Sequence, residues 1–158
     1  MNQDIILANL AAVETHFHSE ATNEVEKALA LFTDDVVWES PVRKLRLRGK
    51  AAAAENYRRM FESFKVEDVV NLQRFATEDR VVDDSVITVV LTGNGVLNAP
   101  VPIGSRAEIR LFHVFEMRAG KISRELVFEN WRVLEPAIDP IAFNAAISTS
   151  SPYHSPHY

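Results

Sequence analysis

The alternation of apolar and polar residues is clearest between Ala107 and Trp131. In its first half, every second side chain falls on one predicted strand face, which holds Ile109, Leu111, His113, Phe115 and Met117. Ala119-Gly120-Lys121 predicts a tight turn, since glycine accepts the positive φ that hairpin turns need. Beyond the turn, the matching face holds Ser123, Glu125, Val127, Glu129 and Trp131. The segment is therefore predicted to be a hairpin whose largely apolar face carries polar groups, and such groups need a partner or a function.

The remaining chain divides into a helical first part and an alternating second part. Apolar residues recur at helical spacing in residues 4–19, 22–32 and 49–64. Strands are predicted at 36–40, 69–76 and 80–92, ahead of the hairpin. The pairs Asp34-Asp35 and Asp83-Asp84 are interpreted as solvated carboxylates in turns. Helices followed by strands, without regular βαβ alternation, predict the α+β class, with a curved sheet and helices packed on one face.

The size of the chain suits one domain, because 158 residues is near the commonest domain length. We assign residues 1–135 to this domain. The patterning fades after Trp131, so residues 136–158 are expected to form a C-terminal extension and a flexible tail.

The composition restricts the partners and the location. A net charge of −5 disfavours nucleic acid as a partner, and the one basic cluster, residues 43–48, has no interleaved aromatic residues. There is no cysteine, which excludes disulfides and thiolate zinc sites and fits a reducing compartment. There is no apolar run of membrane-spanning length and no signal-peptide pattern. A cytoplasmic protein that does not act on membranes is the expectation.

Three segments carry a resemblance to a known group of proteins: FTDDVVWESP, LRGKAAAAENYRRMF and FHVFEMRAGKI. With the order of elements, they resemble the NTF2-like superfamily, and within it the SnoaL-like polyketide cyclases and ketosteroid isomerases. The resemblance implies a cone in which three N-terminal helices pack on the concave face of a curved antiparallel sheet. It also implies a conical pocket for a flat apolar molecule.

The resemblance places individual residues of this chain at functional positions of the isomerases. Tyr57 stands where they keep a tyrosine that supports the oxyanion hole, and His16 where a tyrosine donates to the substrate oxygen. His113 corresponds to their protonated aspartic acid. Ser40 replaces the aspartate that acts as general base. Because an unactivated serine hydroxyl cannot take a proton from carbon at neutral pH, standard ketosteroid isomerisation is not expected.

Four residues are therefore the candidates for catalysis. We expect His113 and Glu129 to transfer protons, since both lie on the inward face of the hairpin. Tyr57 and His16 would orient a substrate oxygen through a polar network. Each candidate has a structural alternative: a satisfied core histidine for His113, a rim carboxylate paired with arginine for Glu129, and a solvated residue at a helix edge for His16.

The pocket wall is expected to combine apolar side chains with a few polar ones. The residues predicted to bind substrate are Trp38, Ser40, Phe61, Phe64, Phe115, Glu125 and Val127. Glu125 lies nearer the hairpin turn, so we expect it to be more exposed than Glu129, and a salt bridge is its structural alternative. For the aromatic residues the alternative is core packing. No local ligand spacing indicates a metal site, so neither a metal nor a cofactor is expected.

The outward face of the hairpin is unusually apolar for a solvent-facing surface. It carries Phe112, Val114, Leu126 and Phe128, which predicts a homodimer formed through the outer sheet face. The function predicted first is a small enzyme without cofactor that performs isomerisation, cyclisation or dehydration on an apolar, ring-containing carbonyl or hydroxyl compound. The alternatives are a non-catalytic ligand-binding or dimerisation module, favoured by Ser40, and a scaffold whose pocket is filled by its own aromatic residues.

Overall fold

The computed structural model of the chain describes residues 2–22 and 24–135. In this part of the chain the helices are α1 (Gln3–Ala21), α2 (Val25–Ala30) and α3 (Lys50–Ser63). The strands are β1 (Phe32–Ser40), β2 (Leu45–Arg48), β3 (Phe64–Ala76), β4 (Arg80–Leu91), β5 (Arg106–Arg118) and β6 (Lys121–Glu135). The α+β class is confirmed. The predicted extension, residues 136–158, lies outside the described residues.

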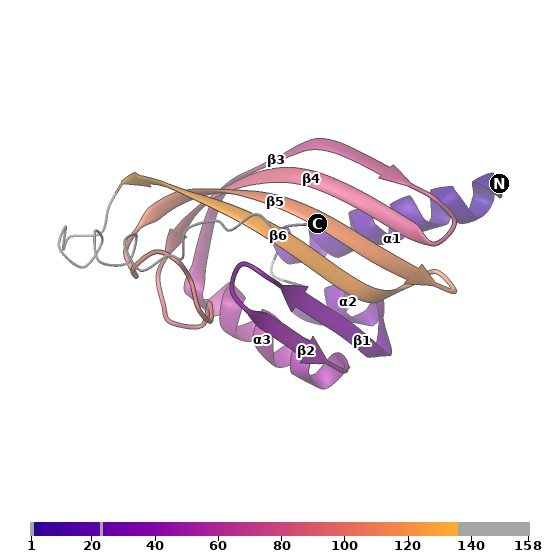
Figure 1. Ribbon diagram of the computed structural model, residues 1–158, viewed down its shortest axis with the longest axis horizontal. Coiled ribbons are helices and arrows are strands. Elements are labelled where there is room, and N and C mark those ends of the chain that lie inside the picture. The colour runs from indigo at the N-terminus through magenta and orange to yellow at the C-terminus, as the bar shows by residue number, and fades with distance from the viewer. Residues whose placement is uncertain (1, 23, 136–158) are drawn as a thin grey trace, which may run out of the picture.

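The strands form one curved sheet in the order β2-β1-β6-β5-β4-β3 (Figure 1). Neighbouring strands are antiparallel except β1 and β6, which run parallel. The sheet is therefore mixed, whereas the sequence predicted an antiparallel one. The difference has a topological cause, because β1 and β6 are joined through most of the fold and no hairpin forces them to reverse direction. β6 therefore lies between β1 and β5 and connects the short β1–β2 pair to the long strands.

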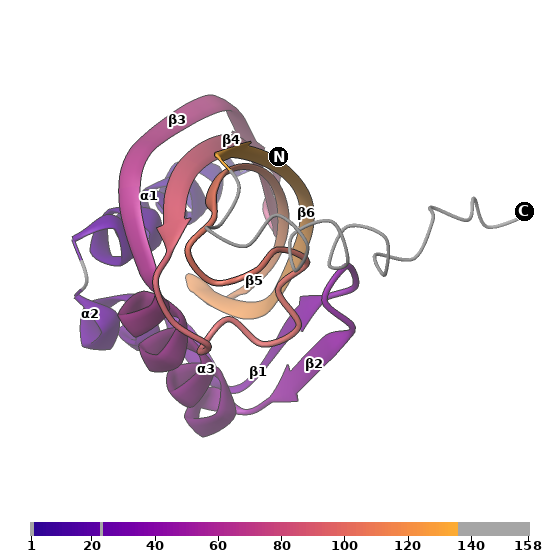
Figure 2. The ribbon, with the colours of Figure 1, turned by 90° about the vertical axis from the view of Figure 1, so that its left-hand side faces the viewer.

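The helices gather on one side of the curled sheet, as the end-on view shows (Figure 2). α1 begins at Asn2, whose side chain accepts hydrogen bonds from the backbone N–H groups of Asp4 and Ile5 at 3.1 and 3.4 Å. Asn9, Val13 and His16 form the buried stripe of α1. The Asn9 amide donates to the carbonyls of the turn between β3 and β4, at 3.0 and 3.1 Å, and so fixes the helix against the sheet.

Register shifts in the long strands curve the sheet. The pairing of β3 with β4 shifts twice, between Val66 and Asp68 and between Asn71 and Gln73, and an extra residue in one strand increases local twist. The β5–β6 turn has positive φ at Ala119 and Gly120, as predicted. Just after it, a shift takes Ser123 out of the predicted alternation, so Ile122 is buried on the concave face instead.

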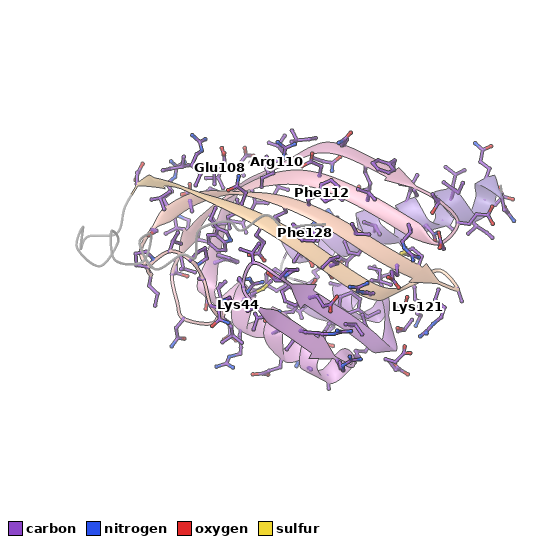
Figure 3. All side chains as sticks on the ribbon, in the orientation of Figure 1. Lys44, Glu108, Arg110, Phe112, Lys121 and Phe128 are labelled. Atoms are coloured by element: carbon purple, nitrogen blue, oxygen red, sulfur yellow. The ribbon has the colours of Figure 1, made fainter. Side chains whose placement is uncertain are left out.

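The convex face of the sheet is turned away from the helices and carries two exposed phenylalanines among several ion pairs. Phe112 and Phe128 are direct cross-strand partners, and their side chains lie close together on this face (Figure 3). They are 39% and 45% exposed, which is high for phenylalanine. Next to them Arg110 makes a two-pronged ion pair with Asp84, at 2.6 and 2.9 Å.

The start of β1 differs from the prediction. The helical stripe was expected to include Phe32, but α2 ends at Ala30 and Phe32 begins the strand. Asp34 and Asp35 are exposed, as expected for solvated carboxylates, yet they lie within β1 and not in a turn. Tertiary packing overrides the local pattern here, because Phe32 is fully buried in the core beside the helices.

Two further polar segments lie within strands, and for Asp83 and Asp84 the predicted solvated turn is wrong. The basic cluster contains β2, in which Leu45 and Leu47 alternate with arginines, and its pairing with β1 extends the sheet edge. Asp83 and Asp84 are 0% and 3% exposed within β4, not solvated in a turn. They fall on opposite faces of the strand, and each is bound by an arginine of a neighbouring strand. No helix of the described residues is long and apolar enough to cross a membrane.

Candidate active site

A cavity of about 360 Å³ lies between the helices and the concave face of the sheet. Its volume falls in the range of small-molecule sites, roughly 300–1,000 Å³. Most of its wall is apolar, and the larger apolar side chains come from helices and strands alike: Phe17, Trp38, Phe61, Phe64, Leu111, Val127 and Trp131. Two sets of buried polar side chains interrupt this wall. We call them the histidine cluster (His16, Glu20, Tyr57, His113, Glu125) and the arginine cluster (Ser40, Arg43, Glu129, Trp131).

Glu125 is the centre of the histidine cluster. Its Oε2 accepts a hydrogen bond from the Tyr57 hydroxyl at 2.8 Å and lies 3.4 Å from His16 Nε2. Its Oε1 lies 3.6 Å from His113 Nε2. Only 2% of Glu125 is exposed, so the expectation that it would be the more solvated carboxylate is wrong. The side chain is buried because α1 and α3 cover this end of β6.

His16 has an acceptor at each ring nitrogen. Nδ1 lies 3.3 Å from the carbonyl oxygen of Ala28, and Nε2 lies 2.9 Å from Glu20 Oε1. Burial on its own lowers the pKa of His16, but the carboxylates of Glu20 and Glu125 more than compensate and raise this pKa to about 10. His16 is therefore an imidazolium at neutral pH.

Tyr57 and Glu125 have complementary protonation states. Burial raises the pKa of the Tyr57 hydroxyl well above its usual value, and the negative charges of Glu125 and Glu20 raise it further. Burial alone would raise the pKa of Glu125, but the hydrogen bond and charge of His16 lower it below its usual value. The cluster therefore contains a carboxylate that accepts and a neutral phenol whose single O–H is already donated to it.

The His113 ring has contacts on its faces and at Nε2 but no hydrogen bond at Nδ1 among the described residues. Its ring stacks on Phe115, with centroids 5.4 Å apart and planes 7° from parallel, and meets the edge of Phe17 at 5.0 Å. Nε2 faces Glu125, as described above. Nδ1 is buried and has no hydrogen-bond partner among the described residues. His113 lines the cavity, and this nitrogen is the buried atom of its ring that has no hydrogen-bond partner.

The arginine cluster surrounds Glu129, four residues further along the same face of β6. Arg43 Nε donates to both carboxylate oxygens, at 3.0 and 3.1 Å, and the side chains of this pair are only 3% and 4% exposed. The Ser40 hydroxyl and the Trp131 indole N–H also donate to Glu129, at 3.2 and 2.9 Å. Glu129 is thus paired with an arginine, the structural alternative considered from the sequence, and is not close to His113 in this network.

A further buried carboxylate, Asp83, lies behind the cavity wall formed by β3 and β4, where its partners Asn71, Arg74 and Ser85 line the cavity. It accepts from Arg74 Nε at 2.7 Å, from Asn71 at 2.6 Å and from the Ser85 hydroxyl at 2.6 Å. Arg74 also pairs with Glu14 of α1. With this many donors Asp83 is fully satisfied, so it fixes the two strands and the helix relative to one another.

One group in the described part of the chain has the spacing of a metal site. Ligand atoms of His16, Glu20 and Glu125 lie within 4.8 Å of one another. Nδ1 of His16 faces a backbone carbonyl, as it does in many metal-bound histidines. A proton on His16 Nε2 satisfies the same two carboxylates, so the cluster is complete without an ion.

Eight of the eleven predicted site residues line the cavity: Trp38, Tyr57, Phe61, Phe64, His113, Glu125, Val127 and Glu129. The other three lie behind the wall. His16 is fully buried and hydrogen-bonded to Tyr57 at 3.2 Å, as predicted, while Phe115 is fully buried in the core. Ser40 is fully buried and supports Glu129. The catalytic and binding roles assigned to these residues stay predictions.

Sequence reasoning did not identify Arg43 or Glu20 as site residues. Arg43 was grouped with a basic cluster whose other members are at the surface, and only the paired strands reveal that it turns inward. A signal for Glu20 was present, since it follows His16 by four residues on a helix, where the two side chains meet.

Solved structures share this fold and differ in described activity. An LEH-like epoxide hydrolase of M. tuberculosis is 20% identical, with a TM-score of 0.63 over 90% of this chain and 91% of that chain. A proposed polyketide cyclase of Xanthomonas campestris pv. campestris is 21% identical, with a TM-score of 0.65 over 80% and 93%. An NTF2-like protein of Burkholderia xenovorans is 17% identical, with a TM-score of 0.63 over 90% and 97%. At these identities the likeness establishes the fold, which is the NTF2-like cone.

The sequence comparison defines the family more narrowly. Residues 13–125, more than half of the chain, match the SnoaL-like domain. The chain therefore belongs to the SnoaL-like family. A comparison with curated proteins found no match.

Proposed function

We propose that the protein is an enzyme that moves a proton on an apolar, ring-containing carbonyl or hydroxyl compound, in an isomerisation, cyclisation or dehydration. The observation that carries the proposal is the state of His113. Its Nδ1 is unpartnered in a mainly apolar cavity, and its Nε2 faces a buried carboxylate. A histidine oriented in this way suits general-base catalysis, because the carboxylate stabilises the imidazolium that forms.

The proposed step begins with a C–H bond next to a carbonyl group. The proton moves to His113 Nδ1, the C–H electron pair forms a carbon–carbon double bond, and the carbonyl π electrons move to oxygen. In a β,γ-unsaturated ketone the product is a dienolate, and return of the proton to its γ carbon shifts the double bond into conjugation and completes an isomerisation. Glu125 would act beside His113 in the role predicted for Glu129, since Glu125 is 3.6 Å away and Glu129 is saturated by its own donors. The scheme needs no cofactor.

The test follows exchange of the protons next to the carbonyl of fused-ring ketones, beginning with tetralone, in D₂O by NMR. Wild-type protein is expected to accelerate exchange. His113→Asn is expected to slow it by about 10²-fold or more, since a general base contributes roughly 10²–10⁴. His18→Asn is the matched control, because His18 borders the cavity but is exposed at its edge.

The second candidate function is ligand binding without catalysis. It is favoured by Ser40, which stands where the isomerases have their base and here only supports Glu129. This alternative would be supported if the wild-type protein binds the ketone tightly but exchanges its protons no faster than the His113→Asn variant does. In either case we propose a small apolar molecule as the ligand and the cytoplasm as the location, since a chain without cysteine suits a reducing compartment.

We also propose that two copies pair through the convex sheet face. The support is the exposed pair Phe112 and Phe128, which has the Arg110–Asp84 ion pair at its side (Figure 3). An apolar patch with polar groups at its edge can pack against the same patch of a second copy about a two-fold axis. Sedimentation velocity should find a dimer. Phe128→Asp should shift it to monomer, whereas Lys121→Asp, at the hairpin end, should not.

A further inference from the structure

The tyrosine and the histidine that the resemblance assigns to a substrate oxygen are not free to bind one. The Tyr57 proton is donated to Glu125 at 2.8 Å. His16 is fully buried, has acceptors at both nitrogens and does not line the cavity. A carbonyl compound in the cavity therefore needs another hydrogen-bond donor for its oxygen.

Several buried donors along the described cavity wall are already used by carboxylates. The Trp131 N–H is used by Glu129, and the Ser85 hydroxyl and the Asn71 amide are used by Asp83. Trp38 is only 2% exposed. Its indole N–H is buried and has no hydrogen-bond partner among the residues that the structure describes. Trp38 lines the cavity, and buried indole N–H groups are usually hydrogen-bonded, so a small movement of the ring would let this donor meet a ligand acceptor.

Arg43 stands next to this donor. Its guanidinium lies over the Trp38 ring, 5.1 Å from the centroid. Arg43 Nε donates to Glu129. The two outer nitrogens have weaker partners, since Nη1 is 3.4 Å from the Leu97 carbonyl and Nη2 is 3.6 Å from the Met60 sulfur. A thioether is a poor acceptor, so this edge of the guanidinium retains capacity for an oxygen.

Charge determines what kind of oxygen fits. Arg43 and Glu129 neutralise each other in a buried pair. A ligand carboxylate would add a buried charge without a counterion, which is costly, whereas a neutral carbonyl adds none. The position also fits, because Trp38 is the cross-strand partner of Glu125. β6 separates β1 from β5, and His113 pairs with Val127, two residues further along β6, so the backbones of Trp38 and His113 lie about 12 Å apart given strand spacings near 4.8 Å and a rise near 3.3 Å per residue, and both side chains line the cavity.

We infer that the Trp38 indole N–H, assisted by Arg43, is the subsite that binds the carbonyl oxygen of a neutral cyclic ketone or enone. This inference rests on the proposed acid–base function and names the other half of its site. When His113 takes the proton, charge develops on the ketone oxygen, and Trp38 and Arg43 are the groups placed to stabilise it.

The first test uses tetralone and tetralin, which share a ring skeleton and differ by the carbonyl oxygen. Calorimetry gives the affinity of each for wild type, Trp38→Phe and Trp131→Phe. Trp38→Phe is expected to reduce the preference for the ketone by roughly three- to tenfold, the worth of one neutral hydrogen bond. Trp131→Phe removes the same chemical group where it is already used, so it should keep the preference. Retention of the preference in Trp38→Phe, or its equal loss in both variants, would overturn the assignment.

The second test needs no folded variant of Trp38. The chain has two tryptophans, so the wild-type protein gives two indole N–H resonances, and Trp131→Phe identifies them. Tetralone should move the Trp38 proton downfield and tetralin should not; equal responses to both would overturn the inference. If tetralone shifts the Trp38 resonance but the protein does not accelerate proton exchange, the proposed reaction is wrong and the oxygen subsite stands. If the protein accelerates exchange but the Trp38 resonance does not respond, the subsite is wrong and the proposed reaction stands.

Discussion

Glu125 and Glu129 occupy the same face of β6, and both are buried, yet their surroundings differ in kind. Glu125 contacts two histidines and a phenol, all groups that can gain or lose a proton. Glu129 contacts a guanidinium, an indole and a serine hydroxyl, which keep their protons at any ordinary pH. The sequence pattern treats the two residues as equivalent, but the partners that each meets in space give them different chemistry.

The comparison shows how a protein can use one residue type for two purposes. A carboxylate saturated by fixed donors is a permanent anion, and it holds Arg43 in position against Trp38. A carboxylate beside histidines is part of a network whose proton positions can change. The arginine cluster is therefore expected to matter for stability and for orientation, and the histidine cluster for pH dependence and turnover.

The largest expected effect is on stability and comes from separating Arg43 and Glu129. Arg43→Met leaves a buried carboxylate without its counterion, which should lower the free energy of unfolding by about 3–5 kcal/mol. Urea denaturation measures the change. The double variant Arg43→Met/Glu129→Gln should recover much of this loss, because the unpaired charge is gone. A loss below about 1 kcal/mol in the single variant, typical of a surface pair, would contradict the buried ion pair.

The next effect is the pH dependence of stability produced by His16. Its pKa in the folded protein is raised from 6.5 to about 10, so the stabilisation is fully present below pH 6.5 and is lost as the pH rises through 10. One unit of pKa shift corresponds to about 1.4 kcal/mol, so the loss over this window is on the order of a few kcal/mol. Thermal unfolding between pH 6 and 10 should show it.

Glu20→Gln provides the control for this pH effect. The variant removes one of the two carboxylates that raise the pKa of His16, so the loss of stability should be smaller and should be complete at a lower pH than in wild type. NMR titration of the His16 ring gives the pKa directly. Titration of His16 near its ordinary value in wild type would contradict the charged histidine cluster.

A smaller expected effect compares the two carboxylates in catalysis. Glu125→Gln should slow ketone exchange by roughly 10²-fold, since it removes the charge that supports the base, and general-base catalysis contributes about 10²–10⁴. Glu129→Gln should slow exchange less, because Glu129 acts only by holding Arg43. The rates at saturating ketone, measured beside circular dichroism spectra, decide between them. Equal losses in both variants would remove the distinction between the clusters.

The smallest effect is expected at Ser40. Ser40→Ala removes one hydrogen bond to Glu129 and should cost about 1 kcal/mol of stability, with little change in exchange rate. The comparison of its unfolding curve with that of Arg43→Met separates the hydroxyl from the ion pair. A large loss of exchange activity in Ser40→Ala would instead give the serine a direct role in catalysis.

The predictable parts of the fold are those set by local patterns. The inward face from Ile109 to Met117 and the turn at Ala119-Gly120 depend only on alternation and backbone freedom, and both are found. The contact between His16 and Tyr57 came from the family resemblance and not from a pattern, because the two residues are far apart in the chain.

The unpredictable parts depend on the register between distant strands and on the packing of helices. Asp83 is buried because Arg74 lies opposite it on β3, a pairing that the β3–β4 register decides. Glu125 is buried because α1 and α3 cover it, and Arg43 turns inward because its partner is on a strand far along the chain. A sequence pattern states which face a residue occupies but not which charge it will meet there.

The parallel pairing of β1 with β6 has a consequence for the order in which the protein can assemble during synthesis. Phe32 pairs with Ile122, about 90 residues later in the chain. The hairpins β3–β4 and β4–β5 can form as their residues leave the ribosome, but β1 has no sheet neighbour except β2 until β6 emerges. Glu125 and Glu129 are both part of that same strand. A nascent chain that stops before β6 therefore lacks the join between the two halves of the sheet as well as the polar centre of the site, so folding and assembly of the site are completed by a single late event.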